Sequence, residues 1–136
     1  MKLLDTDVLI DLFHGNAAAR SYIRQRSTEH EQMAISAITL AEMLGGMRPD
    51  EEIATTRLLN QFTIVDINAG VARQAARFMR AYHDDHHVDL SDALIAASAF
   101  LLGADIVARN VRHNPMPEVL VIEPYRRGAV ARAALN

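Results

Sequence analysis

The stretch that decides the fold is LLDTDVLIDLF, residues 3–13, in which two carboxylates directly follow an apolar run. Residues 1–4 predict a short buried strand, and the apolar residues of 8–13 recur at helical spacing up to a stop at Gly15. Asp5 is therefore expected at the carboxyl end of a strand, directly before a helix. Ligand sites collect at this edge of open α/β sheets, and a carboxylate there needs a cation or polar partners. Alternatively, Asp5 or Asp7 only caps the helix.

The rest of the chain predicts strands that alternate with helices. Further strands are expected at residues 32–36, 62–67, 105–108 and 119–122, and further helices at 16–30, 38–48, 51–61, 70–84 and 90–103. This alternation predicts an α/β fold, in which a central parallel sheet of four to five strands is covered by helices on both faces. Because no linker or internal repeat is visible, residues 1–136 are expected to form a single domain.

Composition narrows the class of protein. The chain has 136 residues, half of them apolar, and a formal net charge of -3, so any polyanion must be bound by a local patch of cations. The absence of cysteine excludes disulfides and thiolate metal sites and fits a reducing compartment. The start lacks the basic segment of a signal peptide, and the longest apolar stretch, residues 93–104, is too short to span a bilayer. We expect a soluble, cytoplasmic protein that does not enter a membrane.

Two further acids lie at positions equivalent to that of Asp5. Glu42 lies near the start of the helix after the second strand, and Asp92 lies in the first turn of an otherwise apolar helix. Converging carboxylates repel one another unless a divalent cation lies between them, which favours a Mg²⁺ or Mn²⁺ site. Such a site can polarise a phosphodiester and activate water. The alternatives are a solvated Glu42 and an Asp92 that only complements the helix dipole. We assign the helix cap to Asp89 and metal binding to Asp92.

Four segments of the chain resemble, in order and in spacing, the motifs of PIN-domain ribonucleases, and most closely those of VapC-type toxins. They are LLDTDVLID (3–11), ITLAEMLGG (38–46), LSDALIAASA (90–99) and ADIVARNVRH (104–113). The resemblance extends from residue 3 to about residue 121 and implies a PIN-like α/β/α sandwich. Two positions depart from the family pattern: Ala108 replaces the usual threonine or serine, and Asn114 stands where an aromatic residue is common. Asp7 is also an acid where asparagine or serine is frequent.

The resemblance also implies a function and roles for individual residues. It implies a metal-dependent endoribonuclease that is the toxin of a type II toxin–antitoxin pair, with an RNA substrate, a cognate antitoxin whose tail occupies the active groove, and a homodimeric state. The matching residues are the acidic triad Asp5, Glu42 and Asp92, the neighbouring hydroxyl of Thr6, and Asn110 at a fourth polar position. Asp5 and Asp92 would bind the metal, and Glu42 would bind it or orient the attacking water. Arg109 and Arg112 follow the fourth strand and are expected to hold RNA phosphates.

Several alternatives stay open. The sequence DTDVL also fits the aspartyl nucleophile of haloacid-dehalogenase-like phosphohydrolases, but that chemistry needs a later lysine, and the chain has only Lys2. A catalytically inactive PIN-like RNA-binding module is the non-enzymatic alternative. Asn110 is either a catalytic residue or the closing residue of a turn. Two other groups of polar residues are ascribed to solvated helix surfaces. One is the stripe of Arg73, Arg77 and Arg80, and the other is the run of His83, His86 and His87, which could alternatively form a zinc site.

Overall fold

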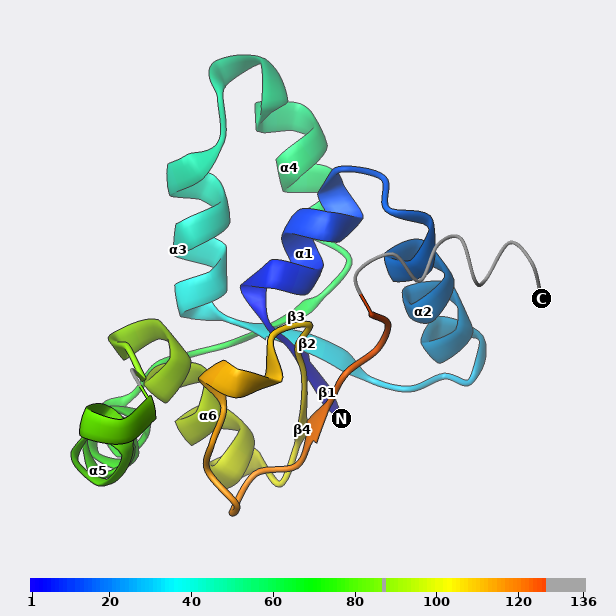
Figure 1. Ribbon diagram of the computed structural model, residues 1–136. Helices are drawn as coiled ribbons and strands as arrows, with labels where there is room; N and C mark the ends of the chain where they lie inside the picture. Colours follow the sequence, from blue (N-terminus) through cyan, green and yellow to red (C-terminus); the bar gives the residue numbers. More distant parts are fainter. Residues whose placement is uncertain (87, 127–136) are drawn as a thin grey trace.

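The computed structural model describes residues 1–86 and 88–126, except for the side chains of residues 83–86 (Figure 1). The strands are β1 (Lys2–Leu4), β2 (Met33–Ser36), β3 (Thr63–Val65), β4 (Asp105–Val107) and β5 (Val121–Ile122). The α-helices are α1 (Thr6–Phe13), α2 (Ala17–Thr28), α3 (Ala37–Gly46), α4 (Glu52–Leu59), α5 (Ala69–His86) and α6 (Leu90–Leu102). Two 3-10 helices, η1 (Pro49–Glu51) and η2 (Val111–His113), complete the described part of the chain.

All five strands are parallel and lie in the order β3-β2-β1-β4-β5, which confirms the predicted sheet. The first strand is in the middle, where Leu3 pairs with Ala34 of β2 on one side and with Ile106 of β4 on the other. Strands β2 and β3 are added in turn on one side of β1, and β4 and β5 are then added on its other side. Such a reversal leaves a crevice at the carboxyl ends of the two strands, here β1 and β4, where ligands bind in open sheets.

Helices cover both faces of the sheet and enclose two apolar cores, which confirms the predicted α/β/α arrangement (Figure 1). One core lies between the sheet and α5 and α6 and includes Phe78 and Ile95. The other lies between the sheet and α1, α2 and α4 and includes Leu9 and Leu59. Helix α3 contributes to both, through Ile38 and Met43, and thereby reaches over the carboxyl edge of the strands.

Caps fix the helix ends that border this edge. Ser36 caps α3, Asp89 caps α6 as predicted, and Gly103 ends α6 in the left-handed conformation (φ 65°) that favours glycine. The helix expected from Val8 begins two residues earlier, because Asp5 accepts a hydrogen bond from the Thr6 backbone. Along the described ranges, no helix is both long and apolar enough to cross a membrane. Helix α6 is mostly apolar, and most of its 13 residues are buried in the protein.

Candidate active site

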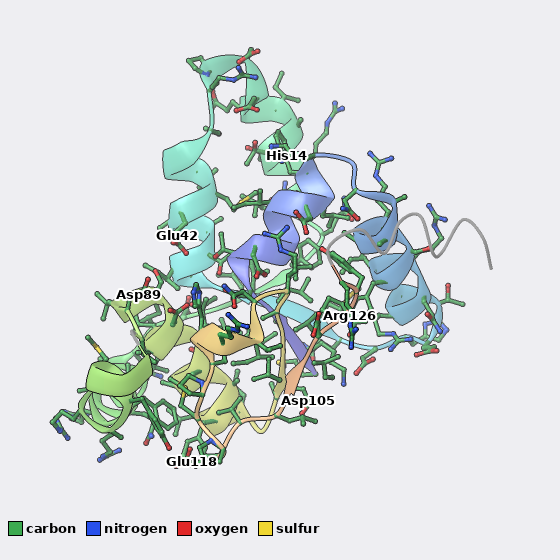
Figure 2. All side chains as sticks on the ribbon, in the orientation of Figure 1. His14, Glu42, Asp89, Asp105, Glu118 and Arg126 are labelled. Carbon is green, nitrogen blue, oxygen red and sulfur yellow. The ribbon has the colours of Figure 1, made fainter. Side chains whose placement is uncertain are left out.

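An acidic cleft of about 320 Å³ opens at the carboxyl edge of the sheet. Its walls come from α1, α3, α6 and the segment after β4, and Figure 2 shows Glu42 and Asp89 on the same side of the molecule. The lining residues are Asp5, Thr6, Asp7, Ile10, Glu42, Asp89, Ser91, Asp92, Arg109, Asn110 and His113. The structure therefore brings together every predicted site residue except Arg112, although these residues are spread over more than one hundred positions of the sequence.

Asp5 has two functions in the local structure. Its backbone N–H donates to the Val107 carbonyl (2.9 Å), so the pairing of β1 with β4 fixes its position. Its buried carboxylate caps α1 by accepting a hydrogen bond from the Thr6 N–H (2.8 Å) and still lines the cleft. Burial, together with the negative charges of Asp7, Asp92 and Glu42, raises the pKa of Asp5 to about 7. Capping and a ligand role are therefore compatible for this side chain.

Glu42 is linked to Asp5 through Thr6. The Thr6 hydroxyl lies 2.9 Å from the Glu42 carboxylate and 3.0 Å from the buried Thr39 hydroxyl. An ionised carboxylate only accepts, and a hydroxyl carries one proton, so the chemically consistent chain has Thr39 donating to Thr6 and Thr6 donating to Glu42. Glu42 is otherwise exposed, so these hydrogen bonds hold its carboxylate toward the cleft.

Asp92 is hydrogen-bonded to Asp89 at the start of α6, and its carboxylate also lines the cleft. Its backbone N–H donates to the Asp89 carboxylate (2.8 Å), which makes Asp89 the cap of α6, as predicted. The Asp92 carboxylate in turn lies 3.5 Å from the Asp89 backbone N–H, a long contact that leaves most of its acceptor capacity unused. Burial first, and then the charge of Asp89, raise the pKa of Asp92 to about 7.

The segment after β4 is held against helix α1 by Asp7. One Asp7 oxygen accepts from the Arg109 backbone N–H (3.3 Å) and the other from the Asn110 backbone N–H (3.0 Å). The side chain of Asn110 accepts from the Arg112 N–H (3.3 Å), and its amide nitrogen lies 3.2 Å from His113 Nε2. Asn110 thus closes the local turn, as one of its two interpretations predicts, and it also lines the cleft.

The two predicted cations have different surroundings. Arg109 is one of the residues that line the cleft, and its guanidinium donates through Nη1 to both oxygens of Asp11, at 2.9 and 3.0 Å. Arg112 is exposed on η2, beside the cleft rather than in its wall. The zinc alternative rests on His87 and on the side chains of His83 and His86, which lie outside the described residues. Arg73, Arg77 and Arg80 are exposed on α5, as expected for a solvated surface.

The oxygen-rich lining fits a divalent cation. Among the described residues, no cationic side chain is bound to the buried Asp5 and Asp92, and burial and neighbouring carboxylates raise the pKa of both. Among the side chains that the structure describes, no three acidic or histidine groups are already arranged around a common metal position. Mg²⁺ needs only one or two carboxylates and takes its remaining ligands from water, so the pair Asp5 and Asp92 satisfies its requirement.

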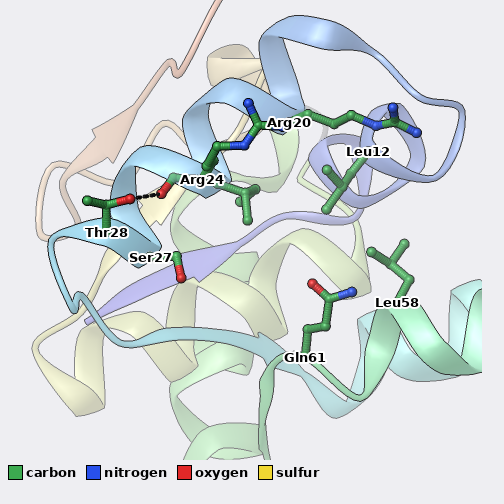
Figure 3. A pocket seen from close by; sticks show the side chains of 8 residues that line it. Leu12, Arg20, Arg24, Ser27, Thr28, Leu58 and Gln61 are labelled. Atoms are coloured by element: carbon green, nitrogen blue, oxygen red, sulfur yellow. Dashed lines mark hydrogen bonds between the residues drawn. The ribbon is translucent and has the colours of Figure 1, made fainter.

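A second cavity of about 510 Å³ lies on the other side of α1 and has a different chemistry (Figure 3). It is lined by Leu12, Arg20, Ile23, Arg24, Ser27, Thr28, Leu58 and Gln61. It contains no carboxylate and none of the predicted site residues, so it is unsuited to the proposed metal chemistry. The haloacid-dehalogenase-like alternative also fails on geometry, because Lys2 starts β1 and is ion-paired to Glu31 and Asp105 at the opposite edge of the sheet.

The structure also adds residues that sequence reasoning missed. Thr39 supports Thr6, His113 lines the cleft, and Asp7 and Asp11 hold the segment after β4. The available signal for the last two was two acids spaced by four residues on an otherwise apolar helix, where they share one face. The departures from the family pattern lie beside this segment: Ala108 is fully buried and supplies no hydroxyl, and Asn114 is also buried.

Comparisons with known proteins agree with this geometry. The family model for the PIN domain matches residues 2–118. The chain is 38% identical over 121 residues to ribonuclease VapC10 of Mycobacterium tuberculosis, covering 88% of this chain and 90% of that protein. It is 33% identical over 117 residues to ribonuclease VapC19 of the same species, covering 85% and 94%. A toxin–antitoxin complex from Klebsiella pneumoniae contains a similar chain, with 30% identity, a TM-score of 0.74, and coverage of 93% of this chain and 100% of that one. By sequence and by fold, this chain belongs to the PIN-domain family.

Proposed function

We propose that this chain is a divalent-metal-dependent endoribonuclease, acting in the cytoplasm as the toxin of a type II toxin–antitoxin pair. One observation carries the proposal: within the described part of the chain, no cationic side chain pairs with the two buried carboxylates Asp5 and Asp92, in a cleft whose wall also contains an arginine. Carboxylates alone repel an RNA phosphate, whereas carboxylates with a bound divalent ion attract it. The ribonuclease names of the relatives and the PIN match support the same activity.

In the proposed mechanism, Asp5 and Asp92 hold Mg²⁺ or Mn²⁺, and Glu42 either completes the ligand set or orients the attacking water. When bound, the ion supplies polarisation of the phosphodiester and makes water a stronger nucleophile at neutral pH. Thr6 keeps Glu42 in place by donating its hydroxyl hydrogen bond. Asp7 accepts a hydrogen bond from the Asn110 backbone and thereby keeps Asn110, the fourth polar residue of the family pattern, in the cleft wall.

RNA recognition is proposed to be electrostatic and local. Arg109 lies in the cleft wall, and Arg112 is exposed beside it, so both are placed to contact the phosphates that flank the scissile bond. The net charge of the chain is -3, which makes these local cations necessary for binding a polyanion.

An apolar groove next to the cleft is the proposed site for the antitoxin tail. The groove has a volume of about 390 Å³, shares Thr6, Ile10 and Glu42 with the cleft, and continues along Phe13 and Met47. A peptide with apolar side chains would bury them in this groove and block the approach to the acids at the same time. The toxin–antitoxin origin of the similar Klebsiella chain supports such a partner. We further propose that residues 1–136 act as one domain and that two copies associate as a homodimer.

The test is cleavage of total RNA by the purified protein across a Mg²⁺ titration. Cleavage should disappear in EDTA and return when Mg²⁺ or Mn²⁺ is restored. Asp92→Asn should remove detectable cleavage, because it exchanges a metal-binding carboxylate for a neutral amide. Asp89→Asn is the matched control: it makes the same chemical change three residues away, keeps a good helix cap, and should retain most activity.

Three results would contradict the proposal. Full cleavage after exhaustive chelation would exclude the metal mechanism. An active Asp92→Asn variant beside an inactive but folded Asp89→Asn variant would show that the two carboxylates have the opposite roles. A folded wild-type protein that binds RNA without cleaving it in any metal would favour the inactive RNA-binding module.

A further inference from the structure

Arg109 is held from both its backbone and its side chain by one face of helix α1. Asp7 accepts the backbone N–H of Arg109, and Asp11, one helical turn later, accepts its guanidinium at 2.9 and 3.0 Å. Asp11 and Asp7 are four residues apart, so they project from the same side of the helix. Asp7 therefore fixes the backbone of Arg109, and Asp11 fixes its guanidinium.

Only one nitrogen of the guanidinium is used in this contact. Both hydrogen bonds to Asp11 come from Nη1, whereas Nε and Nη2 of Arg109 make none to any described residue. The side chain of Arg109 is 38% exposed and lines the acidic cleft, so these two nitrogens remain available to a ligand. A guanidinium with two adjacent free donors matches the two oxygens of a phosphate.

Asp11 is itself fixed by a third partner from the other end of the chain. The Tyr125 hydroxyl donates to Asp11 Oδ2 at 2.8 Å, and the Asp11 side chain is only 13% exposed. Burial, followed by the hydrogen bond to Asp11, raises the pKa of Tyr125 well above its ordinary value, so this hydroxyl stays protonated and remains a donor. The carboxylate that anchors Arg109 is therefore an ordered group.

We propose that Asp11, braced by Tyr125, is a positioning residue that pre-orients the Arg109 guanidinium to bind an RNA phosphate at the cleft. This inference rests on the proposed function and assigns a role to two residues outside the metal site. Holding a long, flexible side chain in its binding geometry before the ligand arrives lowers the entropy lost on binding. Asp11 thus promotes the binding of a polyanion although it carries a negative charge itself.

The opposite interpretation predicts an effect of opposite sign. If Asp11 only neutralised Arg109, or competed with RNA for it, removing the carboxylate would release a cation and tighten RNA binding. If Asp11 positions Arg109, removing it lets the guanidinium sample many rotamers, and RNA binding weakens although the protein becomes less negative. Loss of one ordered, rotamer-rich side chain corresponds to about two- to tenfold in affinity.

The experiment measures binding of a fluorescein-labelled pool of random 20-nucleotide single-stranded RNAs by fluorescence anisotropy. Every protein carries Asp92→Asn, so that the RNA is not consumed. Asp11→Ala should bind about two- to tenfold more weakly than its parent, and Tyr125→Phe should shift affinity in the same direction by less. Glu29→Gln is the matched charge control, because it removes one negative charge from an ion pair on the surface beside α2 and should not weaken binding.

A double variant separates positioning from a general structural effect. Once Arg109 is replaced by alanine, Asp11 has nothing to orient, so Arg109→Ala and the Asp11→Ala/Arg109→Ala double variant should bind RNA equally, within about twofold. Thermal unfolding checks that each variant is folded. If Asp11→Ala does not fold, Asp11→Asn, which keeps the side-chain volume, and Tyr125→Phe take its place.

The inference is overturned if the Asp11 variants bind RNA as tightly as their parent or more tightly, or if the effects of Asp11 and Arg109 add independently. Cleavage of total RNA by the wild-type protein is measured alongside. Absence of that cleavage would contradict the proposed function, whereas intact cleavage with unweakened Asp11 variants would overturn only the positioning role.

Discussion

Replacing Asp5 by asparagine should stabilise the metal-free protein while abolishing RNA cleavage. In the folded protein, burial and neighbouring carboxylates raise the pKa of Asp5 from 3.8 to about 7, whereas the unfolded chain keeps the ordinary value. The folded state therefore binds the Asp5 proton more tightly than the unfolded state does. The wild-type protein loses this contribution to stability as the pH rises from about 4 to about 7. The asparagine does not titrate and still offers an oxygen to the Thr6 N–H that Asp5 caps.

The size of the effect follows from the same pKa. At ~1.4 kcal/mol per pKa unit, the upper limit for ionising Asp5 in the folded protein is about 4 kcal/mol. Side chains and water relax around a buried charge and reduce this value, so we expect Asp5→Asn to gain about 2–3 kcal/mol of unfolding free energy at pH 8. At a pH below about 4 the carboxyl is protonated in both states, and the gain should vanish.

The assay is urea unfolding in EDTA at several values of pH between about 4 and 8. Asp50→Asn is the matched control, since it makes the same chemical change at a 78% exposed side chain on η1, outside the cleft. Saturating Mg²⁺ should stabilise the wild type more than Asp5→Asn, because only the wild type keeps both proposed ligands. A stability difference between Asp5→Asn and wild type that does not grow with pH would refute the reasoning about burial and repulsion at this site.

Three further predictions concern the rest of the cleft and its groove. Thr6→Val should lower cleavage of total RNA by about 10- to 100-fold, because it removes the donor to the acidic triad, and Thr6→Ser should restore it; equal activities would exclude this role. The Arg109→Ala/Arg112→Ala double variant should bind RNA more weakly and leave the Mg²⁺ affinity unchanged. The slope of log affinity against log salt concentration should fall in magnitude by about 0.7 per lost phosphate contact, and an unchanged slope would show that RNA binds at another surface. Met47→Glu, in the apolar groove, should leave cleavage intact but weaken neutralisation by the co-expressed antitoxin; full neutralisation would contradict the proposed groove.

The sequence predicted the parts of the site that depend on where strands end and helices begin. Asp5 and Asp92 were placed correctly relative to their elements because the carboxyl ends of parallel strands share one edge. The role of Asp89 as the cap of α6 also followed from its position before the apolar run of that helix. The ends of strands and the caps of helices depend on residues that are neighbours in the sequence, so sequence patterns can predict them.

The contacts between elements could not be predicted in this way. The hydrogen bond from Thr6 to Glu42 joins residues 36 positions apart and depends on how α1 packs against α3. The ion pair of Arg109 with Asp11 spans 98 positions and depends on the path of the chain after β4. Sequence reasoning placed Arg109 at the right edge of the sheet but did not predict its ion pair with Asp11, because nothing in the order of residues shows which side chains meet.

The central position of β1 has a consequence for the synthesis of this protein. Strand β1 leaves the ribosome about one hundred residues before its neighbour β4, and Tyr125 follows later still (Figure 1). Such distant parallel pairing forms late in folding, because the loss of chain entropy comes before the contacts that offset it. A ribosome-bound fragment that ends before β4 therefore carries Asp5, Glu42 and Asp92 without the backbone that gathers them into a cleft. The cleft of the proposed nuclease can therefore assemble only after β4 has left the ribosome.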